Sequence, residues 1–556
     1  MDLQMPELVL GPLLRYVSHD EATVWVETDS ACEVEILDYT ARTFEVEGHH
    51  YALVVIEGLG PGSATPYEVR LDGHHAWPPP GDVFPQCAVR TLPQNGRIRL
   101  AFGSCRVSLP HHEPYTLRKD EDPRGREIDA LFALTRRMRT QDPEQWPHVL
   151  MWLGDQVYAD EVSPRTRAFI AGRRGDAPPV NEVADFEEYT HLYHEAWQDP
   201  ATRWFLSTVS SSMIFDDHDV HDDWNTSWEW VREMRAKPWW DARITGALMS
   251  YWVYQHVGNL SPRHLEEDEM WGLVRAGGDV TRPLRAFALR ADRETAGTRW
   301  SYCRDLGRTR LVVMDSRAGR VLDDGHRSMV DEDEWRWITE HARGGHEHLL
   351  LATSLPWLLS AAMHCLEAWN EAVCDGAWGQ RAAGWGERVR QGLDLEHWAA
   401  FHDSFTDLVE LVREIGAGEH GDPPATIVAL SGDVHHSYVA DVAYPRSAGV
   451  RSAVHQAVCS PVRNPLDARE QHAIRAAMSA PSHLLGRLLA RSAGVRDPRV
   501  RWRIDDGPWF DNALSTLDIE GPHLHLRIER ATADDEQSRD EDDERRLETV
   551  LERRLA

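Results

Sequence analysis

The pattern of apolar and polar residues changes near residue 98 and divides the chain into two parts. Before this point, short runs rich in β-branched and aromatic residues alternate with turn-forming residues, as in ATVWVET, CEVEILD and YALVVIEG. Short strands separated by turns are typical of small β-sandwiches. Residues 1–97 are therefore expected to form an N-terminal all-β sandwich of the fibronectin or immunoglobulin type, and the Pro-rich stretch WPPPGDVFP and TLPQNG are expected to form its exit.

From about residue 98, short apolar runs end in polar clusters, as in RIRLAFGSCR, HVLMWLGDQVYAD, SSMIFDDHDVHDDWN and ATIVALSGDVHHSY. Helical patterns such as EIDALFALTRRMRT and FHDSFTDLVELVREIG lie between several of these runs. Buried strands that alternate with helices predict an α/β sandwich over residues 98–530. Ligands of such sheets bind beyond the carboxyl ends of the strands, so the polar clusters are expected to converge on one rim.

Three further stretches depart from this alternation. Residues 224–300 are rich in tryptophan, and residues 364–400 form a second, shorter stretch of the same kind. Both are expected to be helical insertions whose tryptophans fill a core rather than stack on a substrate. The segment 531–556 is an acidic, highly charged tail that predicts a solvated helix or a disordered end.

The charge balance narrows the class of partner. The chain has 60 basic and 91 acidic residues, a formal net charge of −31, which disfavours non-specific binding of nucleic acid or anionic lipid. No apolar run reaches the roughly 20 residues needed to span a bilayer, and the N-terminus lacks the cationic start of an export signal. The seven cysteines contain no CxxC pair, which fits a reducing compartment. We therefore expect a cytoplasmic protein that acts on a small molecule.

Two of the polar clusters carry carboxylates at predicted strand ends. In LGDQVYAD, Asp155 could bridge two cations and the phenolate of Tyr158 is a hard donor suited to a ferric ion. In IFDDHDVHDDWN, Asp217 lies beside His218, which is well placed to protonate a leaving oxygen. The alternatives are a capped turn for the first cluster and a solvated acidic loop for the second. The buried run MIF directly before the second cluster argues against a solvated loop.

The other two clusters add nitrogen and sulfur donors. Asp433 and His435 in SGDVHHSY are two residues apart, so on an extended backbone they face the same side. Cys105 ends the strand of FGSCR as a possible thiolate ligand, and the planar fork of Arg106 can hold phosphate oxygens. Taken alone, a buried cysteine is more often core packing, and two histidines with an aspartate can be core residues and a cap. Four strand ends with metal-competent donors together favour a bimetallic site.

The ordered set FGSCR, LGDQVYAD, FDDHD and SGDVHHSY resembles the PhoD-like (alkaline phosphatase D) branch of the calcineurin-like metallophosphoesterases. The resemblance implies a four-layer α/β/β/α core after the small β domain, and a ferric ion with Ca²⁺ near it. It also implies a residue set. Cys105, Asp155, Tyr158 and His435 would hold iron, Asp155 would bridge to a calcium ion that Asp217 and Asp433 also hold, and His218 would be the catalytic histidine.

The expected function is metal-dependent hydrolysis of phosphate esters by a metal-bound hydroxide, with His218 as the proton donor and Arg106 on the phosphate oxygens. The expected activity is that of a phosphomonoesterase, with phosphodiesterase activity as an additional expectation. Two alternatives stay open at this point. One is a phosphodiesterase that uses the same metal site, and the other is a non-catalytic, metal-stabilised binding or scaffold protein.

Overall fold

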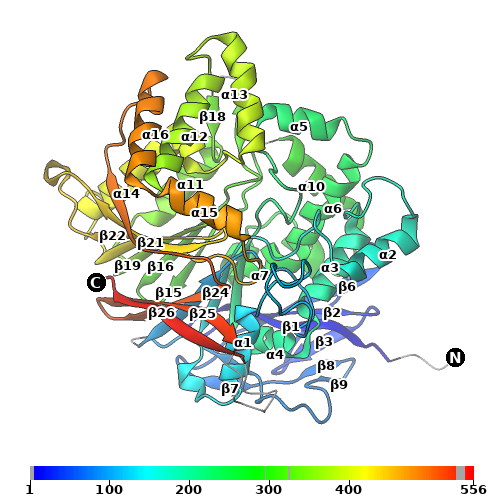
Figure 1. Cartoon of the computed structure of the whole chain (residues 1–556). Helices are drawn as coiled ribbons and strands as arrows, with labels where there is room; N and C mark the ends of the chain where they lie inside the picture. Colours follow the sequence, from blue (N-terminus) through cyan, green and yellow to red (C-terminus); the bar gives the residue numbers. More distant parts are fainter. Residues whose placement is uncertain (1–4, 95, 295, 324–325, 534–544) are drawn as a thin grey trace.

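The computed structural model describes residues 5–94, 96–294, 296–323, 326–533 and 545–556 (Figure 1). Its N-terminal domain is all-β, as predicted, and consists of two facing sheets and a two-stranded ribbon. The first sheet has the order β1 (Leu8–Val17), β2 (Ala22–Thr28), β6 (His49–Ile56), β5 (Phe44–Val46) and β14 (Gly278–Asp279). The second has the order β4 (Tyr39–Arg42), β3 (Glu33–Ile36), β8 (Val69–Leu71) and β9 (His74–Trp77). The ribbon pairs β7 (Ala64–Pro66) with β10 (Ala88–Arg90).

Side chains that alternate along these strands form the core of the domain. Val24, Val54, Val34 and Leu71 are fully buried between the two sheets. The opposite face of the first sheet, which includes Trp25, packs into the core of the second part of the chain. The first sheet is therefore covered on both faces, which fixes the N-terminal domain against the rest of the molecule.

The second part is an α/β sandwich built on two sheets, in the predicted four-layer arrangement. One sheet has the order β13 (Ser210–Ile214), β12 (Val149–Leu153), β11 (Ile98–Gly103), β24 (Ala513–Glu520), β25 (His523–Ala533) and β26 (Arg545–Arg554). The other has the order β15 (Tyr302–Leu306), β16 (Thr309–Met314), β19 (His348–Thr353), β20 (Thr426–Ser431), β22 (Ala453–Val458), β21 (Ser437–Ala443) and β23 (Arg501–Trp509). A short hairpin joins β17 (Val321–Asp323) and β18 (His326–Ser328).

The central strands are parallel and buried on both faces. β11, β12 and β13 pair in parallel, as do β16, β19, β20 and β22. Every residue of β12, β19 and β20 is buried, which explains their continuous apolar runs. Because parallel strands end on one edge of a sheet, the residues that follow these strands meet at one rim.

Helices cover the outer faces of both sheets. α1 packs on β24, β25 and β26, and α11 packs on β16. The helices outside the two insertions are α1 (Ala130–Met138), α2 (Pro164–Arg174), α3 (Phe186–Trp197), α4 (Pro200–Thr208), α11 (Glu332–Ala342), α14 (His402–Ala417), α15 (Ala468–Ala477) and α16 (Ala480–Ser492). No helix in the described ranges is long and apolar enough to cross a membrane.

The first insertion is helical, and its tryptophans fill a core as predicted. It contains α5 (Trp228–Arg235), α6 (Trp240–Ser250), the π-helical segment η2 (Tyr251–His256), α7 (Val257–Asn259), α8 (Pro262–Leu265), α9 (Trp271–Arg275) and α10 (Thr281–Arg293). Trp224, Trp240, Trp252 and Trp300 are almost completely buried, whereas Trp228 is 43% exposed. The second insertion, α12 (Ala361–Cys374) and α13 (Gln380–Gly392), buries its tryptophans less completely.

Polar groups fix the first insertion to the N-terminal domain. The buried guanidinium of Arg15 donates to the backbone carbonyls of Tyr254 (3.0 Å) and Gln255 (2.7 Å). The buried carboxylate of Glu27 accepts from the Tyr254 hydroxyl of the insertion (3.1 Å) and from His194 of α3 (2.9 Å). These groups are satisfied only when the domain and the insertion are in contact, so the N-terminal domain is an integral part of the fold.

The expectation for the C-terminal segment is wrong where the structure describes it. Residues 545–554 form the edge strand β26, which pairs antiparallel with β25, rather than a helix or a disordered end. Three apolar side chains of this strand pack against the main core: Leu547, Val550 and Leu551. Arg553 forms an ion pair with Asp441 at 2.6 Å. The many charged residues of this segment mask its apolar alternation in the sequence, and in the structure they form ion pairs with other strands. Residues 534–544 lie outside the described ranges.

Candidate active site

Four buried strands deliver a candidate site residue at the same place, two positions after the strand ends. Cys105 follows β11, Asp155 follows β12, Asp216 follows β13 and Asp433 follows β20. The first three strands belong to one sheet and β20 belongs to the other. The two sheets therefore place their strand ends side by side, and the predicted convergence on one rim is observed for these segments.

Small residues allow this close approach of the two sheets. The backbone N–H of Asp433 donates to Ser104 Oγ at 3.0 Å, which ties the end of β20 to the end of β11. Gly432 lies against Ser104 so closely that a Cβ at position 432 would clash with its side chain. A glycine is therefore required at this point of the rim, where the two strand ends come into contact.

The backbone at the rim adopts a conformation that non-glycine residues rarely take. Cys105 (φ 56°), Asp155 (φ 52°), Asp433 (φ 66°) and His435 (φ 50°) all have positive φ. Left-handed backbone of this kind costs on the order of 1–3 kcal/mol per residue and is concentrated at functional sites. Four such residues among the six predicted metal ligands indicate that the fold holds these side chains in imposed orientations.

The potential ligand atoms form two groups that share one residue. One atom each of Cys105, Asp155 and His435 lie within 4.8 Å of one another, and so do one atom each of Asp155, Asp216 and Asp217. The Oδ1 atom of Asp155 is buried and accepts no hydrogen bond among the described groups. Asp155 is thus placed to bridge two ions, and its unsatisfied oxygen needs a positive partner.

The electrostatics of Asp155 point in the same direction. Burial raises the pKa of its carboxyl group well above the ordinary value, and nearby His218 opposes this only in part, while Asp216 and Asp217 add to the rise. Carboxyl groups packed this closely repel one another unless positive charge compensates them. His435 is a suitable neutral ligand, because burial lowers the pKa of its imidazole to about 4.

Tyr158 and Cys105 have few other partners. The Tyr158 hydroxyl is buried, donates to Asp155 Oδ2 at 3.4 Å and accepts from Asn464 Nδ2 at 3.3 Å. The Cys105 sulfur lies 3.3 Å from Ser460 Oγ and 3.4 Å from the backbone carbonyl of Asp433. Both side chains border the group formed with Asp155, so the structure brings together the four residues predicted to hold iron.

Asp433 lies at the same rim but outside both groups. Its Oδ2 accepts from His397 Nε2 at 3.1 Å, and its Oδ1 lies 3.7 Å from Arg317 Nη2. The same Nη2 atom lies 3.3 Å from Asp217 Oδ1, and the Arg317 guanidinium also pairs with Asp216. Two of the three residues predicted to hold calcium, Asp217 and Asp433, therefore face a buried guanidinium that sequence analysis did not identify.

Arg317 follows β16 in the motif MDSRAGR, and His397 lies near the end of the second insertion, after α13. Arg317 lies at the end of its strand, close to Asp315. The Asp315 carboxylate caps the turn by accepting from the backbone N–H of Arg317 at 2.8 Å. A buried Glu367 accepts from His397 Nδ1 at 2.7 Å and orients its ring toward Asp433. The strand-end position was a usable signal for Arg317, whereas no local pattern marks His397.

His218 is held by a carboxylate on the other side of the site. Its Nδ1 lies 2.9 Å from Asp160 Oδ1, and its ring lies against Tyr158 with centroids 4.7 Å apart. Burial opposes protonation, but Asp160 and Asp217 outweigh it and raise the pKa of the imidazole well above its ordinary value. A protonated imidazole beside the potential ligands has the properties of a general acid.

Asp219, the last residue of FDDHD, has a structural role. Its carboxylate accepts from the backbone N–H groups of Asp155 (3.0 Å) and Asp216 (2.9 Å) and so ties the ends of β12 and β13 together.

The contacts of Arg106 do not fit the phosphate-binding role predicted for it. Its Nε donates to Asp129 at 2.8 Å, and its Nη atoms donate to the Ala196 carbonyl and Thr202 Oγ1. Asp129 is the N-cap of α1, so this arginine joins the rim to that helix and to α3 and α4. The physical reason is that burial beside an acidic cap directs the guanidinium into the structure instead of toward the ligand groups.

Comparisons with known proteins agree with this geometry. Residues 127–487 match the family model described as PhoD-like phosphatase, and residues 5–89 match a domain of unknown function, DUF7800. Among solved structures, that of PhoD aligns over 100% of this chain and 93% of its own, with a TM-score of 0.55 and 11% sequence identity. A maltogenic amylase from S. marinus aligns with a TM-score of only 0.18 and 8% identity. No curated protein matches the sequence.

Proposed function

The chain belongs to the PhoD-like phosphatases, so its general activity is phosphoester hydrolysis, and we propose that this hydrolysis depends on two metal ions and acts on small phosphomonoesters. The observation that carries the proposal is the sharing of Asp155 between two groups of potential ligands. One residue that serves two ions is characteristic of bimetallic phosphoesterase chemistry.

Each group suits a different ion. The first group offers a donor set that suits Fe³⁺: the thiolate of Cys105, the imidazole of His435, the phenolate of Tyr158 and the carboxylate of Asp155. The second group, Asp155, Asp216 and Asp217, supplies only hard oxygens, which suit Ca²⁺. Asp433 lies outside this group, and the Arg317 guanidinium stands between Asp433 and Asp217. When bound, the two cations supply a water activated for attack on phosphorus and neutralise charge on the phosphate oxygens.

The protein's own residues supply the proton and the orientation. His218 donates a proton to the leaving oxygen, and Asp160 holds the ring by its Nδ1 atom so that Nε2 is left for this transfer. Arg317 compensates part of the charge of Asp216 and Asp217 and keeps both carboxylates in place. The proposed reaction assigns no role to Arg106.

A cavity beside Tyr158 favours a small substrate. Tyr158 lines a cavity of about 250 Å³ whose wall also includes Arg124, Arg126 and Arg167. Binding pockets for larger organic ligands span about 300–1,000 Å³, so this volume suits a short phosphate ester better than an extended chain. Glu161 and Glu195 line the same wall, so the cavity presents arginines and carboxylates together.

The test combines metal content with turnover on the same protein sample. We expect the purified protein to contain Fe and Ca, and to hydrolyse p-nitrophenyl phosphate faster than bis-p-nitrophenyl phosphate. Faster turnover of the diester would replace the monoesterase proposal with a phosphodiesterase. A protein that binds neither metal and turns over neither ester after Fe and Ca addition would refute the two-metal proposal and favour a binding or scaffold role.

A further inference from the structure

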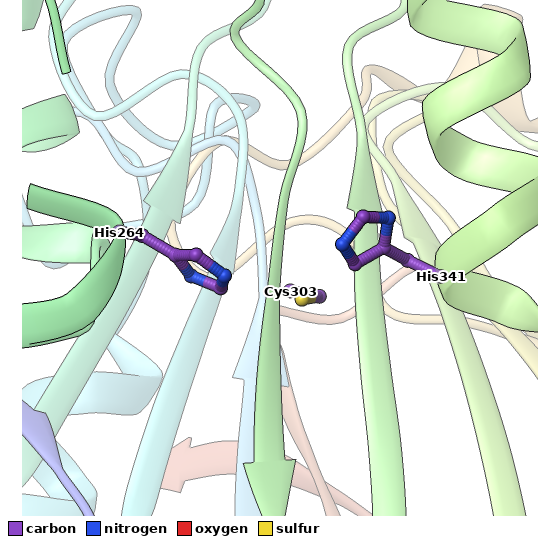
Figure 2. A group of neighbouring side chains, drawn as sticks. All are labelled: His264, Cys303 and His341. Atoms are coloured by element: carbon purple, nitrogen blue, oxygen red, sulfur yellow. The ribbon is translucent and has the colours of Figure 1, made fainter. Parts of the chain in front are cut away.

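A third group of potential metal ligands lies away from the candidate active site and contains none of its residues. One atom each of His264, Cys303 and His341 lie within 4.8 Å of one another. Figure 2 shows the sulfur of Cys303 between the two imidazole rings, with His264 on one side and His341 on the other. The three residues come from α8 of the first insertion, from the edge strand β15 and from the last turn of α11.

The three side chains open into one cavity. It has a volume of about 750 Å³, and its wall includes all three residues together with Glu267. Cys303 is buried and the two histidines are half-buried, so an ion can reach the site from solvent and yet be held largely by protein atoms. Cys303 is a free thiol with no disulfide partner in the described part of the chain.

The orientation of His341 is fixed by contacts within its own helix. Its Nδ1 lies 2.8 Å from the backbone carbonyl of Trp337, one turn earlier, and its ring stacks on the Trp337 indole with centroids 4.0 Å apart. A carbonyl can only accept, so Nδ1 carries the proton and Nε2 keeps its lone pair. A backbone carbonyl on the remote ring nitrogen is the usual support of a metal-ligating histidine. The ring nitrogen left free points toward Cys303 in Figure 2.

We propose that His264, Cys303 and His341 form a zinc-binding site. A thiolate with two imidazoles is a ligand set for Zn²⁺, which takes sulfur and nitrogen donors in a tetrahedral arrangement. Three protein ligands leave one position of the tetrahedron, and the Glu267 carboxylate lines the same cavity. The ligand set contains no hard-oxygen group of the kind that Ca²⁺ requires, so this site differs in metal preference from the carboxylates near Asp155.

Four arginines line the cavity, and in the described part of the chain all of them except Arg263 are engaged by another partner. Arg310 pairs with Asp305 at 2.5 Å and donates to the His341 carbonyl. Arg299 lies over the Trp337 ring, 4.5 Å from its centroid. Arg304 donates to backbone carbonyls, among them that of Gly258 at 2.9 Å. Glu21 and Glu267 on the same wall add negative charge.

A zinc ion at this position would connect three layers of the protein. α8 belongs to the insertion that packs on the N-terminal domain, β15 is the edge of the seven-stranded sheet, and α11 covers that sheet. The ion would therefore fix the insertion to the edge of the phosphatase sheet, and its role would be structural. Binding to the folded state alone raises stability in proportion to RT ln(1 + [Zn²⁺]/Kd).

The test uses Co²⁺ as a spectroscopic replacement for Zn²⁺ in the full-length chain. The Cys105→Ser variant removes the active-site thiolate, so any remaining thiolate-to-cobalt charge-transfer absorption must come from another cysteine. We expect this variant to show the absorption and to lose it when Zn²⁺ is added, because zinc binds such sites more tightly than cobalt. Introducing Cys303→Ala into the same protein is expected to abolish the absorption and to remove one equivalent of bound metal.

The control is Cys365→Ala, which removes a half-buried cysteine of α12 outside this cluster and is expected to leave the absorption unchanged. Circular dichroism establishes that each variant is folded. If Cys303→Ala does not fold, His264→Ala on the short helix α8 provides the second test and should weaken Zn²⁺ binding by at least about tenfold, the lower limit for loss of a supporting group. Absorption that persists without Cys303, or its absence from a folded Cys105→Ser protein, would overturn the proposal.

Discussion

His218 and Asp160 form a directed pair: the imidazole Nδ1 lies 2.9 Å from one carboxylate oxygen of Asp160 and 3.1 Å from the other. The same carboxylate accepts the backbone N–H of Asp222 at 2.6 Å, so Asp160 is held on both sides. This contact orients the ring and supplies the charge that keeps it protonated. Asp160 acts through His218 and is a positioning residue.

Replacing Asp160 by asparagine is therefore expected to impair the proton donor while keeping the fold. Asn keeps the shape of the side chain but removes the charge that stabilises the imidazolium, so kcat should fall by about 10²-fold or more, within the range of general acid catalysis. The loss should be larger for an alkyl phosphate than for p-nitrophenyl phosphate, whose leaving group needs no proton. The alkaline limb of the pH–rate profile should move to lower pH. Equal losses on both substrates would contradict the assignment of His218 as the acid.

Asp155→Asn is expected to remove both metals at once. Asp155 belongs to both ligand groups, so its loss should lower the content of Fe and of Ca together and reduce turnover of p-nitrophenyl phosphate by about 10³-fold or more. Asp176→Asn, at an exposed position, is the matched control and should change neither quantity. Loss of only one metal would show that the two ions do not share this residue.

Tyr158→Phe tests the assignment of the ferric ion. A phenolate bound to Fe³⁺ gives a visible charge-transfer absorption, and Phe retains the ring that lies against His218. We expect the absorption to disappear while most of the calcium remains. Absorption spectra and metal analysis of the same sample provide the measurement. Retention of an unchanged visible band would exclude Tyr158 as a ligand.

Arg317→Met is expected to destabilise the protein strongly. The Arg317 side chain is fully buried among acidic groups, and removal of one partner of such an ion pair typically costs about 3–5 kcal/mol. Because the carboxylates left behind attract cations, added Ca²⁺ should restore more of the lost Tm in the variant than it adds to the native protein. Arg503→Met, at an exposed ion pair, serves as the control. A variant whose Tm does not respond to Ca²⁺ would contradict this view of the site.

The contact between the N-terminal domain and α3 should make the stability of the folded protein depend on pH. Burial opposes protonation of His49, but Glu27 and Glu187 outweigh it and raise the pKa of this histidine to about 9, from 6.5. The protonated form is favoured in the folded state, so the contribution is fully present below pH 6.5 and is lost as pH rises to about 9. The loss should be on the order of 2 kcal/mol, because each pKa unit is worth about 1.4 kcal/mol and partial exposure reduces it.

Thermal melting between pH 6 and pH 9.5 checks this prediction. The His49→Gln variant should lose the part of the pH dependence that falls in this window and should melt lower than the native protein at pH 6. Identical melting profiles for the two proteins across the window would show that the His49 pair contributes nothing.

The residues that sequence analysis identified share one property. Cys105, Asp155, Asp217 and His435 each follow an apolar run that had to be a buried strand, and parallel strands deliver their ends to one edge. The strand pattern therefore predicted the α/β sandwich and the meeting of these segments, whereas the four-layer core was implied by the family resemblance. The positive φ angles depend on the packing of one sheet against the other and have no local pattern.

The residues that were missed or misassigned depend on distant contacts. Arg106 follows Cys105 directly, yet it bonds to Asp129 and Thr202 because those groups are buried beside it. His397 reaches Asp433 from a helical insertion, and only its contact with Glu367 shows why. The C-terminal strand was hidden because its charges find partners on neighbouring strands.

The pairing of β11 has a consequence for biosynthesis. This strand, which ends at Cys105, lies between β12 and β24, and β24 joins it to β25 and β26. β24 leaves the ribosome only after both insertions and the whole seven-stranded sheet have been translated. Until then one edge of β11 has no neighbouring strand, and Cys105 at its end does not have its native contacts. Nascent chains halted before β24 should therefore stay open to proteases and to thiol-modifying reagents, and closure of the catalytic rim should coincide with the arrival of the final hairpin.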